Sequence, residues 1–157
     1  MIKKRQLPTR RAVFIASLSA AFLPSSLGAQ AQDGTDPGKK YMEIECAFGR
    51  QSFTVTLFDN ASAHDLATML PLDLSIEDYS TNEKIAYLPR KLTEDGSGPF
   101  AGEKPGDLCC YAPWGNLAFF HGSYRYSGGL IRLGSLNDGP KPLLQRGRFP
   151  LKIQVTN

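Results

Sequence analysis

The amino-acid sequence predicts a mainly β protein: a closed barrel of about eight strands with one short helix and a second helical turn. Two observations predict it, namely short apolar segments bounded by turn residues and a single run with helical spacing. With 41% hydrophobic and 21% charged residues, the composition excludes collagen, coiled coils and wholesale disorder. Closure is expected because an open sheet would leave two strand edges exposed.

Eight segments carry the apolar residues that predict strands, and the last four are each short and bounded by Gly, Pro, Asn or Asp. They are residues 42–46, 53–57, 72–77, 85–88, 108–111, 117–120, 130–133 and 149–155. Gly49-Arg50 predicts a tight turn between the first two strands. Residues 32–40 have no apolar periodicity and predict a flexible tether, so the domain is expected over residues 41–157.

The helical elements are short. Asp59 and Asn60 can each cap a helix start, and apolar residues at three- and four-residue spacing follow until Pro71 ends the run. Residues 141–145 predict one further helical turn. Residues 90–106 collect glycine, proline and charge, which predicts a long exposed loop of the kind that often carries function.

The first 31 residues have the three parts of an export signal: a basic start, an apolar run and the sequence Ala29-Gln30-Ala31. Arg10-Arg11 resembles the twin-arginine export motif, which is the favoured route; the alternative is that the pair is the positive end of an ordinary signal. The apolar run is shorter than the roughly 20 residues that span a bilayer. We therefore expect cleavage near Ala31, a periplasmic or secreted protein, and no stable membrane insertion after cleavage.

The net charge of the chain comes from this leader. The sequence has 18 basic and 15 acidic residues, formally +3, and the leader holds five of the basic residues and no acidic one. Because the remainder then has 13 basic and 15 acidic residues, its formal charge is −2. A slightly negative domain disfavours binding to nucleic acid.

The three cysteines, Cys46, Cys109 and Cys110, leave an odd thiol in an oxidising compartment. Adjacent cysteines in a strand point to opposite faces, so a disulfide from Cys46 to one of the pair is easier than a bond between neighbours, and the absence of any disulfide is equally open. His64 and His121 do not complete a zinc-ligand pattern, so we expect no metal and no cofactor. The Cys-x-x-Cys and Gly-x-Ser-x-Gly motifs are also missing.

Aromatic residues are densest over residues 111–126, which include the only tryptophan and half of the six tyrosines. Rings beside Asn, Arg and glycine-rich turns suit a shallow groove for an extended peptide or a flat ligand. In the other interpretation, which we favour for most of the rings, they fill the core of the barrel. Trp114 is expected at a rim because it sits in a Pro-Trp-Gly turn. The candidate ligand-binding residues are Tyr87, Tyr111, Trp114, Asn116, Phe120, His121, Tyr126 and Arg132.

Four segments in order carry a resemblance to a known family: EKIAYLP at 83–89, GDL at 106–108, YAPWGNL at 111–117 and YSGGLIRLG at 126–134. Together they resemble the bacterial cyclophilin-like fold proteins over residues 42–155. The resemblance implies a closed barrel of about eight strands with a helix near an open end.

True cyclophilins are peptidyl-prolyl isomerases, in which an arginine stabilises the twisted bond, whose uncatalysed rotation has a barrier of roughly 20 kcal/mol. The family's Phe-His-Arg context is absent, because Gly122 follows Phe120-His121. Arg132, or Arg125, could substitute only from a different position, so Arg132 is the candidate catalytic residue.

Three functions remain open at this point. The leading hypothesis is an exported cyclophilin-like domain, monomeric or weakly homo-oligomeric, that binds an extended peptide or small ligand in an aromatic groove. The second is a peptidyl-prolyl cis-trans isomerase with a non-standard active site. The third is a structural subunit of an envelope assembly.

Overall fold

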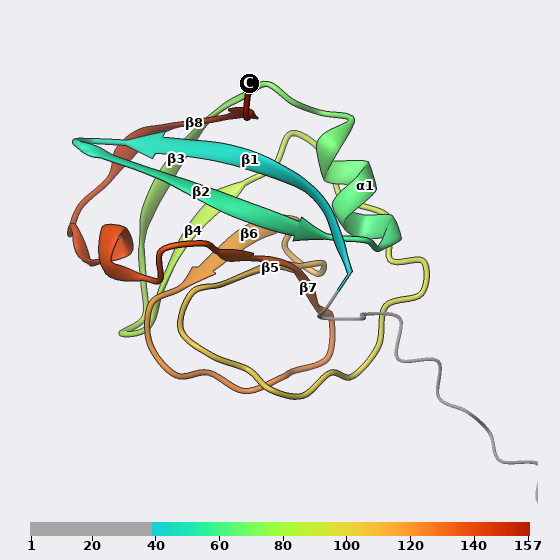
Figure 1. Cartoon of the computed structure of the whole chain (residues 1–157). Helices are drawn as coiled ribbons and strands as arrows, with labels where there is room; N and C mark the ends of the chain where they lie inside the picture. Colours follow the sequence, from blue (N-terminus) through green and yellow to red (C-terminus); the bar gives the residue numbers. More distant parts are fainter. Residues whose placement is uncertain (1–38) are drawn as a thin grey trace, which may run out of the picture. The chain divides into compact units, whose positions relative to one another are not determined.

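The computed structural model describes residues 39–157, which form a closed barrel of eight antiparallel strands with one α-helix and one 3-10 turn (Figure 1). The predicted fold class is therefore confirmed. The predicted export signal and residues 32–38 of the predicted tether lie outside the described residues. The first strand begins at Lys40, which pairs with Phe58, so the last residue of the predicted tether lies in the barrel.

The strands follow the predicted segments closely, because alternation of apolar and polar residues is a direct signature of a half-buried strand. They are β1 (Lys40–Phe48), β2 (Gln51–Phe58), β3 (Leu72–Tyr79), β4 (Glu83–Tyr87), β5 (Asp107–Tyr111), β6 (Asn116–Phe120), β7 (Leu130–Leu136) and β8 (Phe149–Val155). Their order around the barrel is β1-β2-β7-β5-β6-β4-β3-β8, and β8 pairs with β1 to close it. Only three neighbouring pairs are consecutive in the chain: β1 with β2, β3 with β4, and β5 with β6.

The barrel interior is filled by alternate residues of the strands, since successive side chains point to opposite faces. The interior aliphatic and aromatic side chains include Ile44, Val55, Leu57, Ile76, Leu108, Leu117, Phe119, Leu133, Leu151 and Ile153. Full burial of such a side chain contributes about 1.5–3 kcal/mol. This core holds the strands in the register that presents the remaining residues on the outer face.

The single α-helix, α1 (Ala61–Ala67), begins as predicted, with the side chain of Asn60 accepting a hydrogen bond from the Ala63 amide at 2.9 Å. Ala63 and Leu66 bury the inner side of the helix against the barrel core. The 3-10 turn η1 (Lys141–Leu144) buries Leu143 in the same core.

Two long connections run side by side outside the barrel, one after β4 and one after β6 (yellow and orange in Figure 1). The rings of Phe100 and Tyr126 meet edge to face at 5.2 Å, and the Tyr126 amide donates to Glu103 Oε1 at 2.9 Å. Both connections pack on a second apolar cluster, formed on the outer face by Cys109, Ala118, Phe120 and Leu130. The outer face of this part of the barrel is therefore the place where a site can form.

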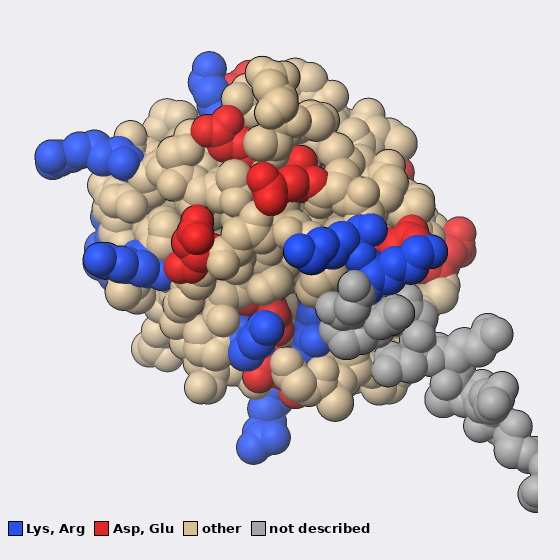
Figure 2. Space-filling model, viewed as in Figure 1, with Lys and Arg blue, Asp and Glu red and all other residues tan. Residues whose placement is uncertain are grey.

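The surface is mixed in charge: on the face drawn in Figure 2, Lys and Arg side chains are interspersed with Asp and Glu. Among the helices of residues 39–157, none has the length and apolar character needed to cross a membrane.

Candidate functional site

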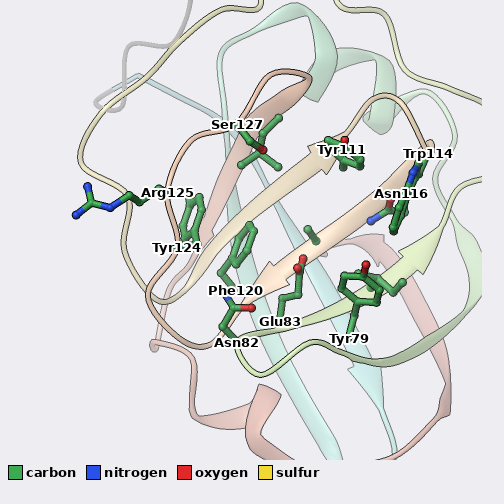
Figure 3. Close-up of a pocket in the computed structure, with 13 residues that line it drawn as sticks. Tyr79, Asn82, Glu83, Tyr111, Trp114, Asn116, Phe120, Tyr124, Arg125 and Ser127 are labelled. Atoms are coloured by element: carbon green, nitrogen blue, oxygen red, sulfur yellow. The ribbon is translucent and has the colours of Figure 1, made fainter.

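A pocket of about 410 Å³ opens on the outer face of the barrel, over strands β4 to β7 and the end of β3 (Figure 3). Its floor is apolar and comes from Ile85, Ala118 and Leu130. Ile85 and Ala118 are direct partners in the pairing of β4 with β6. The same pairing places Glu83 beside Phe120, so the outward residues of two strands far apart in the chain form one surface.

The walls of the pocket are aromatic. Trp114 is 48% exposed and meets Tyr79 and Tyr111 edge to face, with ring centroids 5.6 Å and 5.5 Å away. It is held in a tight turn in which the amides of Trp114 and Gly115 both donate to the Tyr111 carbonyl, at 3.2 and 2.9 Å. Gly115 has φ +68°, a conformation that favours glycine, so the turn that presents Trp114 depends on this residue.

The opposite wall is a stacked pair, Phe120 and Tyr124, with centroids 3.7 Å apart and planes 7° from parallel. The Tyr124 hydroxyl donates to Asp107 Oδ2 at 2.7 Å, which fixes the ring over Phe120. Burial raises the pKa of Tyr124, so the phenol stays protonated and remains a donor to Asp107.

The pocket also contains hydrogen-bond acceptors without protein partners. The Glu83 carboxylate makes no hydrogen bond and no ion pair with any residue in 39–157, and partial burial raises its pKa. Asn116 is buried; its Nδ2 donates to the Leu117 carbonyl at 3.0 Å, whereas its Oδ1 has no hydrogen-bond partner. Asn116 Oδ1 has almost no accessible surface, so the partly exposed Glu83 carboxylate is the acceptor that a ligand can reach. A donor on the ligand would offset part of the free-energy cost of desolvating that carboxylate.

Four of the predicted ligand-binding residues line this pocket: Tyr111, Trp114, Asn116 and Phe120. The other four do not. Tyr87 is exposed on β4 beyond the pocket. His121 lies past the end of β6, where its amide donates to the Asn82 carbonyl at 2.9 Å, and burial lowers the pKa of its imidazole. The Tyr126 ring packs on Phe100, so it holds the connection after β6 against the connection after β4.

Arg132, the candidate catalytic residue, is buried outside the pocket. Its Nη2 donates to the Ala101 carbonyl at 2.9 Å, and its Nε lies 3.4 Å from Asp107 Oδ2 in an ion pair. Its guanidinium stacks 4.3 Å above the Phe100 ring. Arg132 therefore fastens the connection after β4 to the barrel. Arg125 lines the pocket, but its guanidinium projects away from the other labelled side chains (Figure 3).

Three residues that line the pocket are not among the predicted site residues: Tyr79, Glu83 and Tyr124. A signal for Glu83 exists, since it alternates with Ile85 and Tyr87 on one face of β4. No local signal marks Tyr79, which reaches the pocket only because β3 pairs with β4.

The three cysteines are free thiols in the structure, and all are buried. Cys46 lies in the barrel interior on β1, while β5, which carries Cys109 and Cys110, is not its neighbour in the barrel. Burial raises the pKa of Cys46 and of Cys110 to about 12. Within residues 39–157 no cluster of three or more His, Cys, Asp or Glu could hold a metal ion.

Fold and pocket define a class: a closed eight-stranded antiparallel barrel with an aromatic pocket on its outer face. The sequence matches the model of the cyclophilin-like family over residues 46–154, and the chain belongs to that family. A hypothetical protein from Archaeoglobus fulgidus, solved in solution, has a similar fold, with a TM-score of 0.51 and 12% identity over 75% of this chain and 97% of its own. No curated protein matches the sequence.

Proposed function

We propose that this cyclophilin-like domain binds an extended peptide or a small ligand in the outer-face pocket, and that it does so in the periplasm or outside the cell. The observation that carries the binding proposal is the pocket itself. It combines about 410 Å³ of space and five aromatic rings with an accessible acceptor, the Glu83 carboxylate, that has no partner in residues 39–157. Ligand sites are typically concave and mainly apolar, with a few polar groups of this kind.

The export part of the proposal is supported by the signal-like first 31 residues alone. Recovery of the chain only in the cytoplasm, with its first residues intact, would contradict it.

Trp114 provides the test of binding, because it is the only tryptophan and it lines the pocket. Titrating the full chain with a library of peptides and metabolites should change the emission of Trp114 for at least one compound, since a ligand would displace water from the ring. Calorimetry then measures the affinity of that compound.

A matched pair of substitutions separates the pocket from the rest of the surface. Tyr79→Ala removes a pocket wall and should weaken binding about tenfold or more, a loss of about 1.4 kcal/mol. Tyr87→Ala removes a tyrosine outside the pocket that is 52% exposed, against 41% for Tyr79, and should leave affinity unchanged. No response across the library, or equal effects of the two substitutions, would contradict binding in this pocket.

The isomerase alternative has weaker support. It requires a guanidinium beside the bound peptide bond, whereas Arg132 is engaged by Ala101 and Asp107 outside the pocket and Arg125 projects away from it. Conversion of an Ala-Pro peptide no faster than in buffer is the expected result; a catalysed rate that is lost with Arg125→Lys would reverse this conclusion.

A further inference from the structure

The unpaired acceptor at the pocket indicates what kind of ligand it takes. Glu83 points outward from β4, between the walls formed by Tyr79 and Phe120 (Figure 3). Burial raises the pKa of its carboxyl group, with no contribution from a neighbouring charge. Desolvating a carboxylate without a partner is unfavourable, so a cation brought by a ligand would be stabilised here.

Within residues 39–157, no lysine or arginine pairs with Glu83. Two lining residues with donor groups use them elsewhere: the side-chain amide of Asn82 donates to the Ser123 carbonyl at 3.0 Å, and the Tyr124 hydroxyl donates to Asp107. Among the lining residues that the structure describes, Arg125 alone has a positive charge, and its guanidinium projects away (Figure 3). Lys84 precedes Ile85 on the same strand, but it faces the barrel interior and pairs with Asp78.

The other walls favour the same type of ligand. Five aromatic rings line the pocket, and the faces of such rings carry partial negative charge that attracts ammonium and guanidinium groups. An anionic ligand would meet the Glu83 carboxylate and these ring faces, and it would find no inward-pointing cation.

We propose that the pocket selects ligands with a cationic N–H group, an alkylammonium or a guanidinium, joined to an apolar body. The cation lies at Glu83 and the apolar body packs against the rings of Trp114 and Phe120. This inference rests on the proposed ligand-binding function and adds the chemical class of the ligand. The same chemistry occurs in free amines and in the basic side chains of a peptide.

Three probes test whether the pocket prefers a positive charge. Each has a phenyl ring, and they differ in the polar group: 2-phenylethylammonium, 2-phenylethanol and 3-phenylpropanoate. Titrated into the full chain by calorimetry and Trp114 emission, the ammonium compound should bind about tenfold more tightly than the alcohol, as expected for one charge-assisted hydrogen bond, and the carboxylate should bind most weakly. A blocked Lys-Phe dipeptide forms a fourth arm. Tighter binding of the dipeptide than of the free amine identifies a peptide as the source, and the reverse order identifies a small amine.

Glu83→Gln keeps the size of the side chain and removes its charge, so it should reduce the preference for ammonium over alcohol to less than about threefold. Glu94→Gln is the matched control, because Glu94 is exposed on the connection after β4 and does not line the pocket. It should keep the full preference. Thermal unfolding of both variants checks that the barrel is intact.

Equal or tighter binding of 2-phenylethanol, or an unchanged preference in Glu83→Gln, would overturn the inference while leaving ligand binding in place. The absence of any response to all four probes would count against the inference and against the pocket as a ligand site. The two proposals therefore fail in distinguishable ways.

Discussion

Lys84 is a cation enclosed inside the barrel, fully buried among aromatic rings. Its Nζ lies 2.7 Å from Asp78 Oδ1 and 5.5 and 6.0 Å from the ring centres of Phe48 and Phe149. A strand places Glu83 and Lys84 on opposite faces, so one of these two neighbouring charges must point inward. Lys84 takes the inner face because its long side chain can reach Asp78 at the end of the barrel.

We expect Asp78→Asn to lower the free energy of unfolding by about 3 kcal/mol, because it leaves the Lys84 ammonium buried without a counter-charge. Lys84→Met should lower the free energy of unfolding by less than Asp78→Asn does, because it removes the buried charge together with the need for a partner. Urea unfolding of the two single variants and the double variant forms a double-mutant cycle, which should show the pair to be coupled.

The matched control for this pair lies on the same strand. Asp73 is 83% exposed and its carboxylate is 4.0 Å from the Lys152 ammonium, so Asp73→Asn should change stability by less than about 0.5 kcal/mol. If Asp78→Asn were as mild as Asp73→Asn, Lys84 would not need its counter-charge.

At the scale of elements, one carboxylate joins α1 to the connection after β4. Asp65 accepts two hydrogen bonds from Arg90, at 2.6 and 2.9 Å, and a third from the Thr93 amide at 2.8 Å. The bonds from Arg90 are the main cause that lowers the pKa of Asp65 to about 2. The helix and the start of this long connection therefore share one pH-sensitive contact.

A carboxyl group whose pKa is lower in the folded state stabilises the protein above its unfolded pKa of about 3.9, and this contribution is lost as pH falls. For Asp65 the loss should run from about pH 4 down to its folded pKa of about 2. Asp65→Asn should thus be less stable than the unsubstituted chain at pH 6, and the difference should shrink towards pH 2. Urea midpoints measured from pH 6 to pH 2 check this.

Asp95→Asn, on the same connection, serves as the control because Asp95 is exposed and accepts no such set of bonds. Its urea midpoint should change with pH in the same way as that of the unsubstituted chain. A constant difference between Asp65→Asn and the unsubstituted chain at every pH would show that the carboxylate charge is not what joins the two elements.

Element identities were predictable to a large extent because they depend on local patterns. The strand β2 and the cap at Asn60 follow from two-residue alternation and from a side-chain acceptor before a helical run. The apolar pattern predicts the start of β4 at Ile85, two residues late, because the charged residues Glu83 and Lys84 interrupt that pattern. Burial of a lysine inside a barrel contradicts the usual preference of that residue, so the pattern alone does not mark it.

At the scale of the whole molecule, the pairing order decides the site, and local patterns do not determine that order. The pairings of β2 with β7, β4 with β6, and β3 with β8 all join strands distant in the chain. The pocket exists because two of these strands, β4 and β6, place Glu83 beside Phe120. Arg132 was expected in the site for its position in the aromatic stretch, yet the direction of its side chain depends on Asp107 and the connection that covers it.

Closure of the barrel also controls the chemistry of the thiols. Cys46, Cys109 and Cys110 are at most 1% exposed, and burial raises the pKa of Cys46 and Cys110 to about 12. A thiol reagent attacks the thiolate, so a buried thiol with a raised pKa reacts only after the barrel opens. Cys46 and Cys110 lie in the barrel interior, and Cys109 lies in the apolar cluster on the outer face. Because all three are exposed only when the barrel as a whole opens, they should become reactive together.

We expect a chromogenic disulfide reagent at pH 8 to label none of the thiols rapidly in the folded protein and all three in concentrated guanidinium. Adding sub-denaturing urea should raise the three labelling rates in parallel, since each depends on the same opening of the barrel. Rapid labelling of one cysteine in the folded state would show that its part of the barrel opens locally. A single reactive thiol in guanidinium without reductant would show that two of the cysteines are joined in a disulfide, because a bond between them removes two thiols from the three that the sequence provides.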